Sequence, residues 1–459
     1  MNIVFSMDGK LKNYTDLFVS DLYELSIQKI PTNITHHARR CLLDFIASSF
    51  GGSVISRDKL LMLAEDLGDS YGDLPVIGTS IKTNIISAAF LNGIVSHTAE
   101  LDDGVISGIV HPGSPIFSAL IPFAIQNNVN GLDFIKGVVI AYEACVRLSE
   151  AIQPSHKLLG YHATSTCGSI GAALGAAVMV GGKELDMKNA FSSAVITSGG
   201  TLKALHDDSE LKPYNSGNAA MLAISAALLA KAGFSGPNEV LGGDFGFLSM
   251  ASKNHDIDKL FSNKRNEEYA IEKVYFKPYA ACRFCHAPMD ATKGILQETP
   301  IDYKKIKKIE VETYKLAVDG HDQKEVDNIS SAKMSIPFSV SQLLVCGDLG
   351  PLGFSEKELM NKDLTKLSKL INVYDYNEFT SAYPFKSQAR VKIITDNGTY
   401  VKSVDYPTGE PQLPLSDKDI EEKLLILGKE IEIDESKLQS LINASWNLPD
   451  TIYDLYKLL

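Results

Sequence analysis

The sequence is poor in cysteine, in long apolar runs and in clusters of basic residues, and each shortage excludes a class of protein. Its six cysteines are scattered over 459 residues, without the regular spacing of a disulfide-rich secreted domain. The longest apolar stretches, at 170–182 and 219–230, fall short of the roughly 20 residues that a membrane-spanning helix needs. The N-terminal residues lack the apolar core of a signal peptide. We therefore expect a cytoplasmic protein without a membrane partner.

The charge balance is acidic. The chain has 44 Lys and Arg against 56 Asp and Glu, a formal net charge of −12. No basic patch with interleaved aromatic residues is present, so we expect no nucleic-acid partner. Hydrophobic residues make up 45% of the chain, which is enough for a large core, and the length predicts two or three domains.

Apolar residues recur at helical spacing over most of residues 17–261, with no alternation of strands and helices. The composition then changes: residues 304–318 predict a strand and residues 389–406 a hairpin around Asn-Gly. Helices are predicted at 286–297, 335–346 and 361–374, and again after about residue 415. We expect a mainly α fold with an α+β second domain. Its parts are a large helical domain (1–268), a small α+β domain (269–406) and C-terminal helices that rejoin the helical domain (407–459).

Residues 93–114, GIVSHTAELDDGVISGIVHPGS, are the most informative stretch. We predict a helix that continues to Gly104, with His97, Glu100 and Asp103 spaced so that neighbours share a face. The following loop ends at His111. Carboxylates beside a loop histidine suit binding and proton transfer; a solvated helix end before an ordinary loop is the other interpretation.

Further cationic residues precede small-residue or apolar helices. His162 lies before a helix rich in glycine, Lys212 before another helix, and Lys277, Arg283 and His286 stand in KPYAACRFCHAPMDA. Singly, each is more typical of a turn or a surface. Together, cations near helix N-termini suit a di- or tricarboxylate, and could stabilise the charge that builds up when a proton α to a carboxylate is removed.

The run Cys282-x-x-Cys285-His286 matches the attachment pattern of c-type haem. That attachment belongs to exported chains, which the N-terminus does not indicate. A zinc site would need a second pair of ligands, and an iron–sulfur cluster at least three suitably placed thiolates. We therefore predict no haem and no metal.

The motifs NGIVSHTAELDDG, HPGS, GYHATSTCG, KPYNSGNAA and KPYAACRFCHAPMDA stand in this order in the chain. With SIPFSV and the PLSxxDIxxK run near Leu415, this series resembles the MmgE/PrpD family over nearly the whole length. That family includes 2-methylcitrate dehydratases, cis-aconitate decarboxylases and iminodisuccinate epimerases. The resemblance implies a large all-helical domain, a smaller α+β lid domain, an active site between them, a homodimer, and no metal or organic cofactor.

The resemblance also implies functional residues. The family's decarboxylase has them at the positions of His111, His162, Lys212 and His286, and all four residue types are kept. Three positions depart from the pattern. Glu100 stands where the family has a functional Asp, Gly104 where it has a functional Thr, and Asn215 where a His is common.

We predict a cofactor-independent, dehydratase-like lyase that abstracts a proton α to a carboxylate of a small di- or tricarboxylate. Epimerisation or isomerisation, decarboxylation of a cis-aconitate-type substrate, and carboxylate binding without catalysis remain alternatives. His162 is the expected base and His111 the next candidate. The predicted catalytic residues are His162, His111, Glu100 and Lys212, and the predicted substrate-binding residues are His286, Arg283, Lys277 and Asp103.

Overall fold

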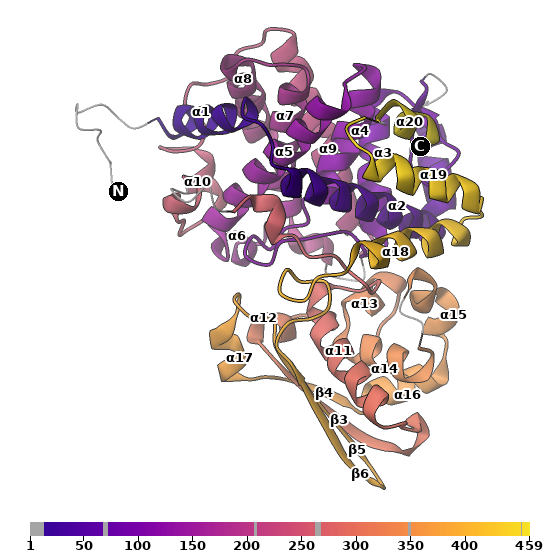
Figure 1. Cartoon of the computed structure of the whole chain (residues 1–459). Helices are drawn as coiled ribbons and strands as arrows, with labels where there is room; N and C mark the ends of the chain where they lie inside the picture. Colours follow the sequence, from indigo (N-terminus) through magenta and orange to yellow (C-terminus); the bar gives the residue numbers. More distant parts are fainter. Residues whose placement is uncertain (1–12, 68–71, 206–208, 262–267, 348–349, 451) are drawn as a thin grey trace.

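The structure is a computed structural model that describes residues 13–67, 72–205, 209–261, 268–347, 350–450 and 452–459. A large helical body lies above a smaller part built around one sheet (Figure 1). The body confirms the helices predicted between residues 17 and 261. Its main elements are α1 (Tyr14–Ser26), α2 (Thr32–Asp66), α3 (Ile85–Thr98), α4 (Gly113–Gln126), α5 (Gly131–Ile152), α6 (Ser155–Leu158), α7 (Ala163–Met179), α8 (Glu184–Thr197), η1 (Leu202–Leu205), α9 (Lys212–Lys231), α10 (Phe247–Ala251), η2 (Ile257–Lys259) and η3 (Ala270–Lys273), with the short strands β1 (Leu74–Pro75) and β2 (Lys82–Thr83).

Glycines let the central helices α5 and α7 approach backbone to backbone. A Cβ atom added at Gly171 would lie 2.5 Å from the carbonyl oxygen of Ala141, and one at Gly175 equally close to that of Gly137. A larger residue at either position would push the two helices apart. The small-residue pattern in the sequence therefore marks a real close contact, which fixes the start of α7 beside the other central helices.

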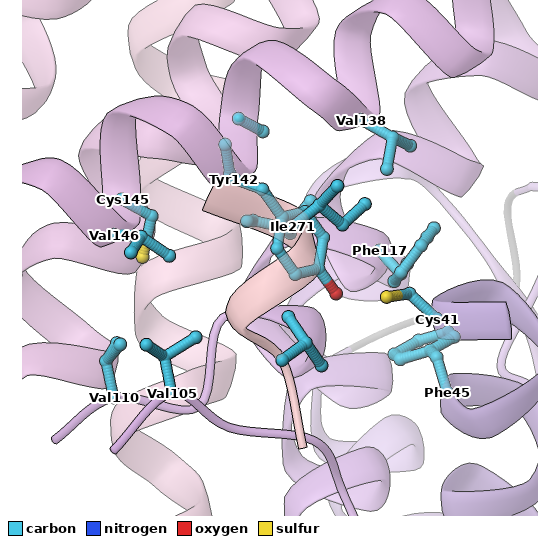
Figure 2. Packing of buried hydrophobic residues seen from close by; sticks show 14 of the residues in the cluster. Cys41, Phe45, Val105, Val110, Phe117, Val138, Tyr142, Cys145, Val146 and Ile271 are labelled. Atoms are coloured by element: carbon cyan, nitrogen blue, oxygen red, sulfur yellow. The ribbon is translucent and has the colours of Figure 1, made fainter. Parts of the chain in front are cut away.

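Large apolar side chains from several helices meet in the core (Figure 2). The Phe117 ring of α4 lies 5.3 Å from the Phe45 ring of α2 and 6.2 Å from the Tyr142 ring of α5, measured between ring centroids. Ile271 of η3 packs into the same cluster. The segment that leads into the smaller part is therefore anchored in the helical body.

The smaller part has a four-stranded sheet in the order β4-β3-β5-β6. Its strands are β3 (Ile306–Thr313), β4 (Ile371–Asp375), β5 (Ala389–Thr395) and β6 (Gly398–Val404). The hairpin of β5 and β6 is confirmed, with Thr395 opposite Gly398. The prediction of helix at 371–374 is wrong, because the β-branched Ile371 and Val373 pair in parallel with β3 instead.

Helices cover one face and the rim of this sheet (Figure 1). α11 packs on β5, β6 and α14, and α14 also contacts β4. The helices of this part are α11 (Arg283–Glu298), η4 (Tyr303–Lys305), α12 (Lys315–Val318), α13 (Ile329–Met334), α14 (Ile336–Val345), η5 (Pro351–Phe354), α15 (Glu356–Leu359), α16 (Lys362–Lys369) and α17 (Asn377–Ala382).

The chain then returns to the helical body as α18 (Asp417–Glu430), α19 (Glu435–Trp446) and α20 (Ile452–Leu458). α18 runs beside α2 (Figure 1). Its Lys423 Nζ donates to Asp44 Oδ1 and to the Leu101 carbonyl, both at 2.7 Å. The predicted boundary at residues 268/269 adjoins 262–267, which lie outside the described residues. None of the described helices is both long and apolar enough to cross a membrane.

Candidate active site

The segment after α3 differs from the helix that the sequence predicts up to Gly104. α3 ends at Thr98, and Glu100 takes a left-handed backbone conformation with φ +55°. A residue with a Cβ pays roughly 1–2 kcal/mol for this conformation. The turn removes Glu100 and Asp103 from a common helix face, and directs the two carboxylates to different surroundings.

Glu100 lies between two lysines that come from distant segments. Lys212 Nζ, at the first residue of α9, pairs with Glu100 Oε1, and Lys277 Nζ lies 3.2 Å from Glu100 Oε2. Burial would raise the pKa of the Glu100 carboxyl, but the two ammonium groups hold it well below its usual range. Glu100 is therefore a buried carboxylate, 3% exposed, that neutralises part of a cationic cluster.

The bonding of His111 fixes which ring nitrogen carries the proton. His111 Nδ1 lies 2.7 Å from the carbonyl oxygen of Asp103. A carbonyl only accepts, so Nδ1 carries a hydrogen and Nε2 of the neutral ring keeps its lone pair. Burial, followed by the nearby Lys277 ammonium, lowers the pKa of His111 to about 3. His111 is a neutral imidazole whose Nε2 carries no hydrogen.

His162, the residue just before α7, has the opposite arrangement. Asn215 Nδ2 lies 3.1 Å from the Thr201 carbonyl, which fixes the amide orientation, and 3.2 Å from His162 Nδ1. His162 Nδ1 therefore accepts, and Nε2 carries the hydrogen. Burial, then His97 and Lys212, hold the pKa of His162 well below its ordinary value, whereas Glu100 acts in the other direction. The ring is a neutral hydrogen-bond donor.

A third imidazole that the sequence analysis did not select lies between these two. The His97 ring stacks on the His162 ring at a centroid distance of 5.9 Å and lies tilted against the His111 ring at 5.2 Å. His97 Nδ1 is 2.7 Å from Asp102 Oδ2. Burial opposes ionisation of Asp102, but His97, His111 and Lys277 lower its pKa overall. His97 Nε2 has no hydrogen-bond partner among the described residues. The sequence offered a signal for this pair, since His97 and Asp102 both lie in the acidic run after Gly93.

Asp103 supports the site from behind. Its carboxyl oxygens accept from the Gly113 amide at 2.8 Å and from the Tyr142 hydroxyl at 2.6 Å. Burial, opposed by the Tyr142 hydrogen bond, raises the pKa of Asp103 to about 8. Its carboxyl group thus ties the loop to α4 and α5, while its carbonyl orients His111.

Arg283 and His286, at the start of α11, bond mainly to the protein. Arg283 donates to the carbonyls of Thr408 and Pro407 at 3.1 and 3.2 Å, and pairs with Glu410 at 3.2 Å. His286 Nε2 donates to the Ala281 carbonyl at 3.0 Å, and its Nδ1 accepts from Arg283 at 3.1 Å. His286 is fully buried, and in this arrangement would influence a ligand through Arg283.

A cavity of about 800 Å³ lies between the helical body and the smaller part. Five predicted site residues line it: Glu100, His111, His162, Lys212 and Arg283. The other three lie behind the wall: Asp103, Lys277 and His286, which are 3%, 0% and 0% exposed. Other residues of the wall that the sequence analysis did not place in the site include Tyr275, Cys282, His321 and Lys333.

Tyr275 explains why Gly104 is tolerated beside the cavity. The two residues form an antiparallel bridge, with hydrogen bonds of 3.1 and 2.8 Å between their backbones. A Cβ at Gly104 would lie 2.3 Å from the Tyr275 hydroxyl oxygen. The phenol ring therefore fills the space that a side chain at position 104 would occupy.

The described residues hold no group of three or more His, Cys, Asp or Glu side chains arranged to bind a metal ion. Cys282 and Cys285 are both free thiols. The Cys282 thiol faces the cavity: burial raises its pKa, but His321 and Lys212 outweigh this and bring it to about 7.

A helical body and a smaller α+β part enclose a cavity lined by histidines and lysines, and so define a two-domain protein with its candidate site between the domains. The profile of the MmgE/PrpD N-terminal domain matches residues 19–260, and that of the MmgE/PrpD C-terminal domain matches residues 279–448. The chain belongs to the MmgE/PrpD family, as the motifs predict.

Curated relatives are similar at low identity over almost the full length. The cis-aconitate decarboxylase-like protein oryM of Aspergillus oryzae is 25% identical across 95% of this chain and 94% of its own length. The cis-aconitate decarboxylase of Homo sapiens is 23% identical across 96% of this chain and 92% of its own. These relatives support a family of enzymes that act on carboxylates.

Proposed function

We propose that this protein is a lyase that abstracts a proton α to a carboxylate of a small di- or tricarboxylate, and then eliminates water or another β leaving group. One observation carries the proposal: two neutral imidazoles of opposite tautomer, His111 and His162, face the same cavity beside the Lys212 ammonium. One ring can accept a proton and the other can donate a hydrogen bond, as an elimination requires.

His111 is the proposed base, in place of the His162 that the sequence favours. Its Nε2 lone pair is available, whereas His162 Nε2 already carries hydrogen. The pKa of His111, about 3, describes the site without a bound anion, in which the neighbouring lysines disfavour the imidazolium. A bound dianion would offset the Lys277 and Lys212 charges and raise that pKa towards the range where proton abstraction is efficient.

Lys212 is proposed to bind the carboxylate next to the reacting carbon. Its charge would stabilise the negative charge that moves onto this carboxylate as the proton leaves. His162 Nε2–H would donate to the leaving oxygen or to the same carboxylate. Glu100 holds Lys212 in position, since the two side chains are paired.

Proton NMR in D₂O with a panel of di- and tricarboxylates, including 2-methylcitrate and cis-aconitate, tests the reaction. New vinyl signals from a hydroxy acid indicate elimination. His111→Gln should abolish α-proton exchange and reduce kcat by about 10²–10⁴-fold. His162→Gln, which keeps a donor, should retain exchange. Loss of exchange in His162→Gln but not in His111→Gln would reverse the assignment.

Decarboxylation is the second candidate, favoured by the names of the two relatives. The same groups would then protonate the carbanion that remains after CO₂ leaves, and cis-aconitate would give CO₂ in the assay. Exchange without a new product would indicate an epimerase or isomerase. Silence across the whole panel would favour a protein that binds carboxylates without catalysis.

We also propose a cytoplasmic homodimer. The six cysteines are all free thiols, which suits a reducing compartment. Exposed apolar side chains on α8 and α9, including Leu185 and Ile196 at 66% and 65% exposure, support a contact with a second copy. Light scattering coupled to size-exclusion chromatography tests the dimer; a mass near 50.0 kDa would refute it.

A further inference from the structure

Lys333 is a buried lysine in the cavity wall with no role in the scheme above. It lies on α13 of the smaller part, and its side chain reaches the end of α3 in the helical body, where Nζ donates to the Thr98 carbonyl at 3.0 Å. Only 2% of the residue is exposed. One donor hydrogen is thus engaged by a neutral acceptor, and two remain for other partners.

The charged groups around Lys333 leave it without an anion of its own. Glu100 is paired with Lys212 and Lys277, and among the described residues no carboxylate lies within 4.0 Å of Lys333 Nζ. From the neighbouring segment, the Cys282 amide donates to the Lys333 carbonyl at 2.8 Å. Of the three lysines around the Glu100 carboxylate, Lys212 and Lys277 are paired with it. Lys333 is the one of the three that lines the cavity without a described carboxylate within 4.0 Å.

We propose that Lys333 binds a second carboxylate of the substrate, so that the ligand spans Lys212 on the helical body and Lys333 on the smaller part. This inference rests on the proposed carboxylate substrate, and narrows it to compounds with at least two carboxylates. A monocarboxylate would satisfy Lys212 and leave Lys333 unpaired. The ligand would also link the two parts of the protein across the cavity.

The surroundings of Lys333 couple ligand binding to the uptake of a proton. Burial is the largest influence and lowers its pKa to about 7, with Lys212 and Lys277 acting in the same direction and Glu100 in the opposite one. A bound carboxylate favours the ammonium and raises the pKa again. At pH 8 the free protein holds Lys333 mostly neutral and the complex holds it charged, so binding takes up as much as about one proton.

Isothermal titration calorimetry at pH 8 in two buffers of different ionisation enthalpy measures this uptake. The probe is tricarballylate, a saturated tricarboxylate without a leaving group. For the wild type we expect binding with net proton uptake. In Lys333→Met the uptake should fall by up to about one proton, leaving only the share of the Cys282 thiol in the same cavity wall, and Kd should rise about 10- to 150-fold, the loss of one charge-assisted hydrogen bond. Lys307→Met, an exposed lysine on β3, is the matched control and should behave as the wild type.

The outcomes separate this inference from the proposed function. If wild-type protein binds tricarballylate with no proton uptake, or if Lys333→Met keeps both the uptake and the affinity, the role of Lys333 is refuted while the function stands. If wild-type protein shows neither binding nor α-proton exchange with any polycarboxylate, the function itself falls. Lys333→Gln gives the same test should the methionine variant not fold. Butyrate, which has one carboxylate, should bind the wild type and the Lys333 variant equally weakly.

Discussion

Glu100 is the residue whose replacement should have the largest consequence for stability. Its carboxylate is buried and shared by Lys212 of the helical body and Lys277 of the segment that leads into α11. Glu100→Gln keeps the shape but leaves two buried ammonium groups without their anion. Removing one member of a buried pair costs about 3–5 kcal/mol, because the remaining charge stays desolvated. We expect the free energy of unfolding at pH 7 to fall by that amount.

The difference between wild type and Glu100→Gln should depend on pH with a defined sign. The folded-state pKa of Glu100 lies well below its usual value near 4.5, so the carboxylate stabilises the fold. That contribution is complete above about pH 4.5 and is lost as the pH falls towards the folded-state pKa. Urea unfolding of both proteins between pH 3 and pH 8 should therefore give curves that converge at the acid end.

The matched control is Glu210→Gln, which breaks the exposed pair of Glu210 and Lys59. An exposed pair is screened by water, so this variant should unfold much like the wild type at every pH. Equal stability of Glu100→Gln and wild type at pH 7, or a difference that persists unchanged at pH 3, would show that Glu100 is not the charged partner of the two lysines.

Further substitutions test individual contacts. Lys212→Ala should lower kcat/KM about 10- to 150-fold in steady-state assays, and His286→Ala should act through Arg283 with an effect in the same range; unchanged kinetics in both would place them outside the site. Gly104→Ala should displace the buried Tyr275 ring and so lower both the thermal unfolding temperature and the activity; unchanged values of both would contradict the close contact. Cys282→Ser with Cys285→Ser should keep activity that survives EDTA, whereas stoichiometric metal lost together with activity would contradict the prediction of no metal.

The spacing of apolar residues predicted most of the fold. It failed at a short segment that can form either a helix or a strand. The body helices and the β5–β6 hairpin follow from apolar spacing and from the Asn-Gly turn. Residues 371–374 continue an amphipathic helix in the sequence, but become an edge strand because β3 offers a partner far along the chain. Long-range pairing of this kind leaves no local signal.

The sequence could predict which residues belong to the candidate site, but not which of them line the cavity and which lie behind its wall. Motif order pointed to Glu100, His111, His162 and Lys212, and these four residues line one cavity. Sequence spacing could not show that Asp103 and His286 lie behind the wall, because which side of a loop faces solvent depends on backbone turns such as the left-handed Glu100. Lys333 was invisible for a similar reason: it reaches the site from α13, 235 positions from its acceptor Thr98.

The assignment of acid and base depends on two groups that carry no charge. The Asp103 carbonyl forces hydrogen onto Nδ1 of His111, and the Asn215 amide, held by the Thr201 carbonyl, forces it onto Nε2 of His162. Two histidines that look equivalent in the sequence thereby present opposite hydrogen-bonding groups to the cavity. Asn215 is also the position where the chain departs from the histidine common in the family, and an imidazole there could donate or accept towards His162. The asparagine removes that choice, because its orientation is fixed by an acceptor on its other side. Tautomer control by Asn215 thus connects one departure from the family pattern to the direction of proton transfer that we propose for this cavity.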